Sequence, residues 1–223
     1  MNLLAVGHDF KTVKGEKKGV LTGIMYLTPG KTCPFSSAGC RSACLNTAGR
    51  GVFSNVQAGR ARKTALFNAD KVGFIDLLKK DIGALVRKAG RRGLLPAVRL
   101  NGTSDIKWED LAGSNGKTVF EEFPDVQFYD YTKDYTRFDT ALPSNYDLTF
   151  SRSECNEARA VELAQKGLAR VAVVFKTARE TWNGLKVIDG DESDIRFNDP
   201  RGVVVGLTAK GKARKDTSGF VVA

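Results

Sequence analysis

The feature that most constrains the fold is a series of short apolar segments that recurs along most of the chain. These segments are rich in β-branched and aromatic residues and are followed by glycine, proline or charged residues, which is typical of β-strands. We expect strands within residues 20–29, 94–102, 126–133, 145–153, 169–176, 185–191 and 202–209. Because polar or helical segments separate most of them, the pattern predicts βα units and a mainly parallel sheet.

Three of the segments between or before these strands have the character of helices. In residues 71–90, apolar side chains recur at i, i+3, i+4 and i+7, and Gly90 marks the end of the pattern. Residues 156–167 predict a second helix that ends at Gly167. Residues 54–70, rich in alanine and arginine, favour a third.

The length favours a single α/β domain over residues 1–223. A complete eight-stranded βα barrel takes roughly 250 residues, and the last connections in this chain are short. We therefore expect a partial or compressed βα (TIM-like) barrel of parallel strands. A doubly wound open sheet is the alternative, but the glycine-rich phosphate loop that such a sheet would place after its first strand is missing from the sequence.

Residues 32–51, TCPFSSAGCRSACLNTAGRG, form a glycine- and serine-rich loop directly after the first predicted strand. This cysteine loop contains Cys33, Cys40 and Cys44 with the spacing C-x6-C-x3-C, and Cys155 lies far downstream. Three clustered thiols and one remote thiol suit an iron–sulfur cluster, whereas structural zinc more often uses two short CxxC-type pairs. The sequence therefore predicts a metal site with these four cysteines as ligands.

The identity of the metal stays open at this point. A [4Fe-4S] cluster is favoured, and a [2Fe-2S] cluster, a zinc ion or no metal are the alternatives. His8, the one histidine, could replace Cys155 as a ligand, although a lone histidine is more often structural. The short apolar start does not suit a signal peptide, so we expect a cytoplasmic protein, and in that compartment structural disulfides are rare.

The predicted topology gives Cys155 a place near the cysteine loop. It follows the strand within residues 145–153, and loops that follow parallel strands share the carboxyl edge of the sheet. The cysteine loop is thus expected at the C-terminal mouth of the barrel. Polar residues near other strand ends predict a cofactor-binding pocket there, formed by Asn101, Asp105, Tyr131, Lys133 and Ser151. Ordinary polar strand ends are an equally good interpretation.

The net charge of +10 and the pI near 9.5 favour nucleic acid or another polyanion as a partner. Basic runs occur at residues 87–92 and 210–216, and Phe128, Tyr129 and Tyr131 are aromatic residues that could stack on bases. Aromatic residues at alternate positions of a strand are more often part of the core. General solubility is the alternative explanation of the charge. No apolar run predicts a membrane span, and the sequence does not determine the oligomeric state.

Other functional patterns in the sequence are weak. The acidic phrase at residues 189–194 fails the EF-hand template, because Asp194 occupies the position of the required glycine. We interpret it as a solvated loop. With a single histidine, neither a Ser-His-Asp nor a Cys-His catalytic arrangement is credible, so the sequence leaves open whether the protein is an enzyme.

Four phrases of the sequence together resemble the gene-product-88-like family of phage and plasmid proteins. They are YLTPGKTCPFSSAGCRSACLNTAGRG, RLNGTSDIKWED, FYDYTK and DIRFNDPRGVVVGLTAKGKA, of which the first is the most specific. The resemblance implies a phage-type origin, and hence the cytoplasm of a host cell, without implying an activity.

More loosely, the cysteine loop followed by βα repeats is similar to radical-SAM-like iron–sulfur proteins, which have a [4Fe-4S] cluster at the mouth of a barrel. The spacing differs from the C-x3-C-x2-C of those proteins, and their glycine-rich SAM-binding phrase is not found. SAM binding is possible only if one iron is open, and Cys155 as a fourth ligand would close the cluster. The alternative function is a closed-cluster or zinc-stapled nucleic-acid-binding accessory protein without catalysis.

Overall fold

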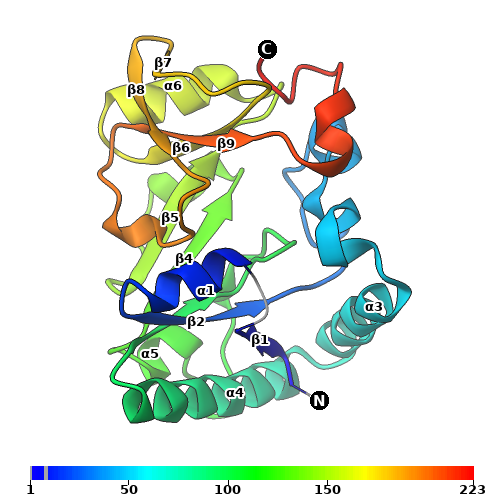
Figure 1. Cartoon of the computed structure of the whole chain (residues 1–223). Helices are drawn as coiled ribbons and strands as arrows, with labels where there is room; N and C mark the ends of the chain where they lie inside the picture. Colours follow the sequence, from blue (N-terminus) through cyan, green and yellow to red (C-terminus); the bar gives the residue numbers. More distant parts are fainter. Residues whose placement is uncertain (1, 8–9) are drawn as a thin grey trace.

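A computed structural model gives the structure of the protein and describes residues 2–7 and 10–223. Within these residues the chain forms a mixed α/β fold built on one sheet (Figure 1). The strands are β1 (Leu4–Val6), β2 (Val20–Met25), β3 (Leu95–Arg99), β4 (Gln127–Thr132), β5 (Tyr146–Ser151), β6 (Arg170–Phe175), β7 (Thr181–Trp182), β8 (Leu185–Asp189) and β9 (Val204–Thr208). The α-helices are α1 (Phe10–Glu16), α2 (Ala38–Ser42), α3 (Ser54–Ala69), α4 (Lys71–Arg91), α5 (Val119–Glu122) and α6 (Glu157–Gln165).

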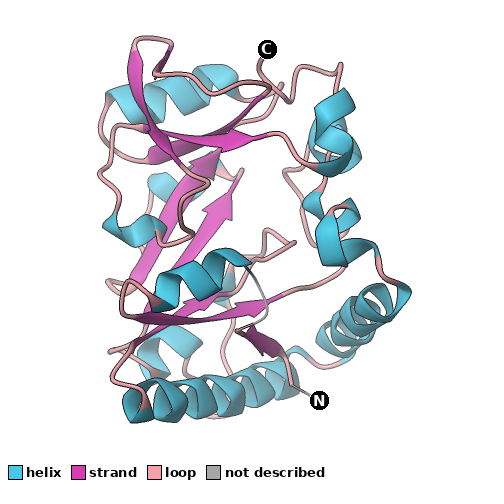
Figure 2. Cartoon of the chain, viewed as in Figure 1, coloured by secondary structure: helices cyan, strands magenta, loops and turns pink. Residues whose placement is uncertain are grey.

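Short 3-10 helices complete the connections between these elements. They are η1 (Leu45–Thr47), η2 (Gly49–Val52), η3 (Trp108–Asp110), η4 (Tyr135–Phe138), η5 (Arg196–Asn198) and η6 (Gly211–Lys215). Figure 2 shows helices and loops arranged around the strands. The predicted helices within residues 54–70, 71–90 and 156–167 are confirmed as α3, α4 and α6.

The strand order is β1-β2-β3-β4-β5-β6-β9-β8-β7. Neighbours from β2 through β9 to β8 are parallel, whereas β1 pairs antiparallel with β2 and β7 antiparallel with β8. From β1 to β6 each new strand is added on the same side of the last one. The predicted α/β fold with a mainly parallel sheet is therefore confirmed.

The sheet is not closed, so a barrel is not confirmed. In the part of the chain that the structure describes, β1 and β7 are the two outer strands and do not pair with each other. A barrel requires the first and last strands to be hydrogen-bonded. Strand β7 was not predicted, because two residues are too short to give an alternating pattern. Strand β1 lies within residues 1–19, whose short apolar start favours a strand or an arm.

Helix α4 forms the largest part of the core on one face of the sheet. The Asp70 side chain accepts a hydrogen bond from the Gly73 backbone N–H at 2.9 Å, which caps the start of the helix. The predicted apolar stripe is buried, including Phe74, Ile82 and Leu85, and each such side chain contributes roughly 1.5–3 kcal/mol by leaving water. No helix in the described ranges is both long and apolar enough to cross a bilayer.

The two faces of the sheet are covered differently. Alternation along the strands puts residues such as Leu148 and Phe150 under α4 and α6, in two apolar clusters on the same face. On the opposite face, Ile195 packs with Val20 and Tyr129. The long helices thus lie on one face, while the segment around η5 covers part of the other.

Candidate functional site

The cysteine loop follows the carboxyl end of β2, as predicted, and lies beside the ends of the parallel strands (Figure 1). Its first turn is closed by the Cys33 backbone N–H, which donates to the Gly30 carbonyl at 2.9 Å. Gly30 has a φ of 102°, a value that favours glycine. The Thr28 backbone N–H donates to Thr64 Oγ1 of α3 at 2.9 Å, so the loop begins at a fixed point.

Cys33 is half-buried against the loop that follows β3. Its Sγ lies 3.6 Å from the Thr103 carbonyl oxygen, and the Asp105 backbone N–H donates to the neighbouring Thr32 carbonyl at 2.7 Å. Burial raises the pKa of the Cys33 thiol, and the nearby Asp105 and Cys44 raise it further. In this arrangement Cys33 favours the neutral thiol.

Cys40 lies within helix α2, and Cys44 lies in the turn that follows the helix. Cys40 packs against an apolar cluster that includes Ala213 and Phe220 near the C-terminus. The Cys44 Sγ accepts a hydrogen bond from the Asn46 backbone N–H at 3.5 Å. Burial raises the pKa of Cys44 and so does Cys40, whereas the Asn46 backbone and the charges of Arg60 and Lys133 lower it. Cys44 is therefore within electrostatic reach of both other loop cysteines.

Cys155 is exposed, but the residue before it binds directly to the cysteine loop. Glu154 accepts a hydrogen bond from the Ser37 hydroxyl at 2.8 Å and another from the Gly39 backbone N–H at 2.7 Å. Ser37 is the N-cap of α2, the helix that contains Cys40. A Cβ at Gly39 would lie 2.8 Å from both Glu154 carboxylate oxygens, so a larger residue there would displace the Glu154 side chain from its present contacts.

The cysteines converge on one region without forming a coordination sphere. Among the residues that the structure describes, no group of three or more histidine, cysteine, aspartate and glutamate side chains is placed to hold a metal ion. The donor types nevertheless suit iron–sulfur or zinc binding, since both use thiolates. His8 lies outside the described residues, so the structure does not place this alternative ligand.

Asn101 is brought to the carboxyl edge of the sheet, but its side chain is already engaged within its own loop. Its Oδ1 accepts hydrogen bonds from Ser104 Oγ at 2.7 Å, the Ile106 backbone N–H at 3.0 Å and Trp108 Nε1 at 3.0 Å. Its Nδ2 donates to the Ile106 carbonyl at 3.0 Å. The contacts observed for Asn101 therefore hold the loop after β3, and its predicted role in cofactor binding stays a prediction.

Asp105, Lys133 and Ser151 form a connected group at the ends of three strands. The Lys133 backbone N–H donates to Asp105 Oδ2 at 2.8 Å, and Lys133 Nζ donates to Ser151 Oγ at 2.7 Å. Burial raises the pKa of Asp105, which also lies beside Cys33. Since Lys133 acts on Cys44, this group borders the cysteines from the side of the sheet.

Tyr131 lies under the guanidinium of Arg99, with 4.6 Å between the cation and the ring centroid. Arg99 in turn pairs with the buried Asp194 at 3.0 Å. Tyr131 therefore belongs to a polar network on the face of the sheet that the segment around η5 covers. Of the two interpretations of the aromatic residues of β4, stacking on bases is wrong for Phe128 and Tyr129, because both are fully buried in the core.

The acidic phrase at residues 189–194 is not simply a solvated loop. Asp191 accepts hydrogen bonds from the Thr208 backbone N–H at 2.8 Å and from Lys210 Nζ at 2.6 Å. Asp194 is 4% exposed and neutralises Arg99. The interpretation is thus wrong for Asp194, whose burial could not be read from an acidic run.

Arg60 is a residue that the sequence reasoning missed. It is buried on α3, its guanidinium lies 5.0 Å from the Tyr26 ring centroid, and its Nη1 donates to Asn46 Oδ1. Within the described ranges it forms no ion pair with a carboxylate, and its Nε has no hydrogen-bond partner. Burial lowers its pKa. Nothing in the sequence distinguishes it from the exposed Arg62 of the same helix.

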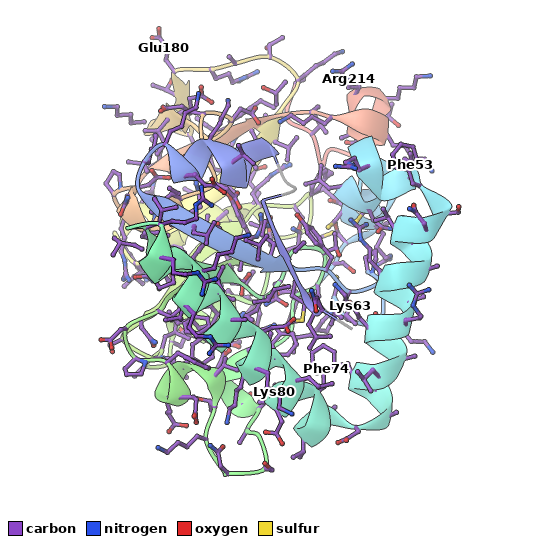
Figure 3. The ribbon with its side chains drawn as sticks, turned by 60° about the horizontal axis from the view of Figure 1, so that its bottom comes forward. Phe53, Lys63, Phe74, Lys80, Glu180 and Arg214 are labelled. Atoms are coloured by element: carbon purple, nitrogen blue, oxygen red, sulfur yellow. The ribbon has the colours of Figure 1, made fainter. Side chains whose placement is uncertain are left out.

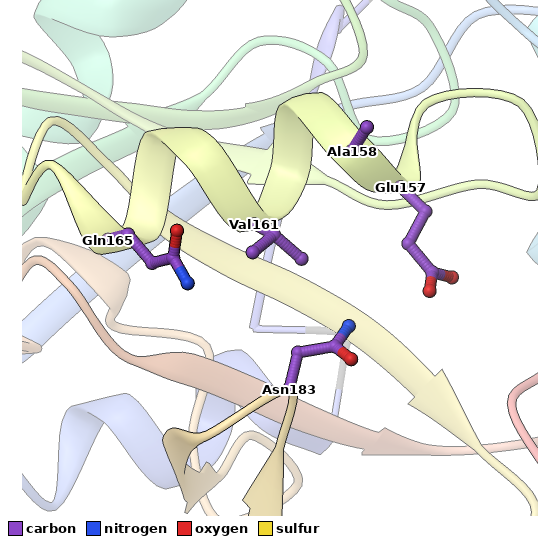
Figure 4. Close-up of a pocket in the computed structure, with 5 residues that line it drawn as sticks. All are labelled: Glu157, Ala158, Val161, Gln165 and Asn183. Atoms are coloured by element: carbon purple, nitrogen blue, oxygen red, sulfur yellow. The ribbon is translucent and has the colours of Figure 1, made fainter.

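Figure 4 shows a shallow pocket between α6 and the turn that joins β7 to β8, with Glu157, Val161 and Asn183 among its lining residues. Its residues include none of the cysteines and none of the predicted cofactor-binding residues. Its polar side chains do not converge on one point in the close-up. We therefore place the candidate site at the cysteine loop rather than at this pocket.

Comparisons with known proteins give one match. A family model described as Gene product 88 matches residues 2–223. No curated protein and no solved structure matches the chain. The looser similarity to radical-SAM-like proteins finds no support in these comparisons. Since the match covers nearly the whole chain, the protein belongs to the Gene product 88 family.

Proposed function

We propose that this member of the Gene product 88 family binds an iron–sulfur cluster, with [4Fe-4S] favoured, through Cys33, Cys40, Cys44 and Cys155. The observation that carries the proposal is the pair of hydrogen bonds that Glu154 accepts from Ser37 and Gly39. They join the segment of the remote cysteine to the helix of a loop cysteine. Three clustered thiols plus one from a distant segment is a ligand pattern that iron–sulfur clusters use.

The charges around the loop support an anionic cluster. Each thiolate ligand brings a negative charge, and a buried charge needs an opposite charge or hydrogen bonds nearby. Arg60 and Lys133 both act on Cys44, and Arg60 forms no ion pair with a carboxylate in the described part of the chain. The positive charges of Arg60 and Lys133 are therefore available to offset the negative charge of the bound cluster.

Binding requires local rearrangement and loss of protons. The thiol pKa values of Cys33 and Cys44 are raised by burial, so these ligands must release protons when a metal binds. Cys155 is exposed, and the residue before it already contacts the cysteine loop. The proposal thus expects the metal to pull the four sulfur atoms together.

The finer architecture that we propose is a partial βα barrel with the cluster at its mouth. The order of the strands supports it, because successive strands are added in one direction and the long helices cover one face. In such an arrangement the loops that follow the strands share one end of the sheet. A cluster with only three cysteine ligands would leave an iron open for SAM or another ligand.

Anaerobic reconstitution with iron and sulfide tests the proposal. We expect about four iron and four sulfide per chain for the unchanged protein, and none for the C33S/C40S/C44S variant. Ser42→Ala, at an exposed position of the same loop, is the matched control and should retain the full content. A protein that binds only zinc would contradict the proposal. So would a triple variant that contains as much iron and sulfide as the unchanged protein.

Cys155→Ser then separates the closed cluster from the open one. Partial or complete loss of the cluster is expected if Cys155 is the fourth ligand. A fully retained cluster would overturn that assignment while leaving the three-cysteine site intact. A change of its EPR signal on addition of SAM would then indicate an open iron.

A further inference from the structure

A second surface feature lies at the same end of the molecule and does not depend on a metal. We define the cap as residues 32–53 together with η6. Large apolar side chains are unusually exposed there: Phe35 is 44% exposed, Leu45 59% and Phe53 54%. Exposed apolar side chains that gather in one region mark interaction sites more often than singly scattered ones.

The cap is also strongly basic. Between Glu16 and Asp70 the sequence contains no acidic residue, whereas Arg41 and Arg50 of the cysteine loop are both exposed. Neither arginine forms an ion pair with a carboxylate in the described ranges. A surface with an excess of positive charge attracts polyanions.

The C-terminal segment extends this surface from a distant part of the sequence. Ala213 of η6 packs in the same apolar cluster as Cys40 and Ala43, so η6 lies against the cysteine loop. Its Lys212, Arg214 and Lys215 are exposed. Figure 3 shows the labelled Phe53 and Arg214 on neighbouring segments at one end of the molecule, with Lys80 at the other.

We propose that the cap binds single-stranded nucleic acid. Proteins that hold single strands combine positive charge that follows the phosphates with aromatic side chains on which bases stack. The cap supplies both, with Phe35 and Phe53 as stacking platforms. A duplex keeps its bases stacked inside, and an acidic peptide has no bases, so neither would use the exposed rings.

Fluorescence anisotropy with a labelled oligothymidylate of about 16 nucleotides tests this inference. Phe35→Leu and Phe53→Leu keep apolar volume but remove the ring, and each should weaken binding at least about five-fold. Lys212→Ala/Lys215→Ala should weaken binding and reduce the steepness of its salt dependence by about 0.7 per lost phosphate contact.

Matched controls lie away from the cap. Leu95 is a large apolar residue that is 70% exposed at the start of β3, so Leu95→Ala should leave affinity unchanged. Lys80→Ala/Lys186→Ala removes the same charge as the cap double variant, at exposed positions on α4 and β8. The unchanged protein is tested with and without a reconstituted cluster, so failure of cluster binding leaves this result readable.

The competitors decide the kind of partner. The inference expects the single strand to bind more tightly than a duplex or polyglutamate of equal charge. Comparison of the DNA strand with an RNA strand of the same length shows which of the two nucleic acids the cap prefers. Undetectable binding would overturn it. So would equal affinity for polyglutamate with no effect of the phenylalanine substitutions, since the surface would then act through charge alone.

Discussion

The core beneath helix α4 and the cap differ in the exposure of their large apolar side chains. On α4, Phe74, Leu78 and Ile82 are fully buried in the same apolar cluster as Trp108. In the cap, Phe35 and Phe53 remain about half exposed, beside half-buried cysteines and uncompensated arginines. The first region is explained by folding stability, whereas the cap is explained better by something that it binds.

The largest expected effect separates the two regions by stability. Phe74→Ala removes a buried ring whose centroid lies 5.3 Å from that of Phe67, and we expect a loss of about 3–5 kcal/mol in the free energy of unfolding. Urea unfolding followed by circular dichroism measures it. Phe53→Ala in the cap should change stability by about 0.5 kcal/mol or less. If both substitutions lowered the free energy of unfolding equally, the proposed difference between the core and the cap would be contradicted.

The second prediction concerns a buried carboxyl in the core. Asp130 accepts hydrogen bonds from the Asn101 backbone N–H at 2.7 Å and the Tyr146 hydroxyl at 2.9 Å, and burial raises its pKa to about 7. In the unfolded chain the pKa is about 3.9. Between these values the folded state retains a proton that the unfolded state has lost, so stability falls as pH rises.

Unfolding experiments at a series of pH values measure this slope, which is at most about 1.4 kcal/mol per pH unit for one group. Asp130→Asn should flatten it, whereas Asp110→Asn at an exposed position should not. An unchanged slope in the Asp130 variant would indicate that the folded protein contains an ionised Asp130.

The third and smallest effect is expected at Glu154 in the cap contact, with the opposite pH dependence. Partial burial raises the pKa of Glu154, but the hydrogen bonds from Ser37 and Gly39 outweigh burial and lower it overall. Its stabilisation is therefore present above the unfolded pKa of about 4.3 and lost as pH falls through the lowered folded value.

Glu154→Gln should cost about 1 kcal/mol near neutral pH and nothing at low pH, because a neutral amide accepts these hydrogen bonds less strongly. Glu180→Gln, an exposed control, should have no effect. If the cost of Glu154→Gln persisted at acid pH, the carboxylate charge would not be what holds the two cysteine segments together.

The sequence predicts the core better than the cap for a physical reason. The stripe on α4 repeats with the helical period, so Phe74, Leu78 and Ile82 could be assigned to the core. The parallel strands can also be recognised locally, from short apolar segments that are rich in β-branched residues. Asn101 and Asp105 were placed correctly at a strand end, but no local pattern states whether a polar side chain faces a ligand or its own loop.

The contacts that organise the cap join residues far apart in the sequence. Glu154 binds Ser37 and Gly39 across more than a hundred positions, and η6 returns from the C-terminus to pack on Cys40. Such contacts depend on the completed fold and leave no period in the sequence. The only local indication was that Glu154 precedes Cys155.

The most direct test of the central claim is the metal content of the protein purified without oxygen and without added iron or sulfide. The account predicts a brown protein with about four iron and four acid-labile sulfide per chain, both lost in the C33S/C40S/C44S variant. A colourless protein with one zinc and no sulfide would contradict it, and the cysteine loop would then be a structural zinc site.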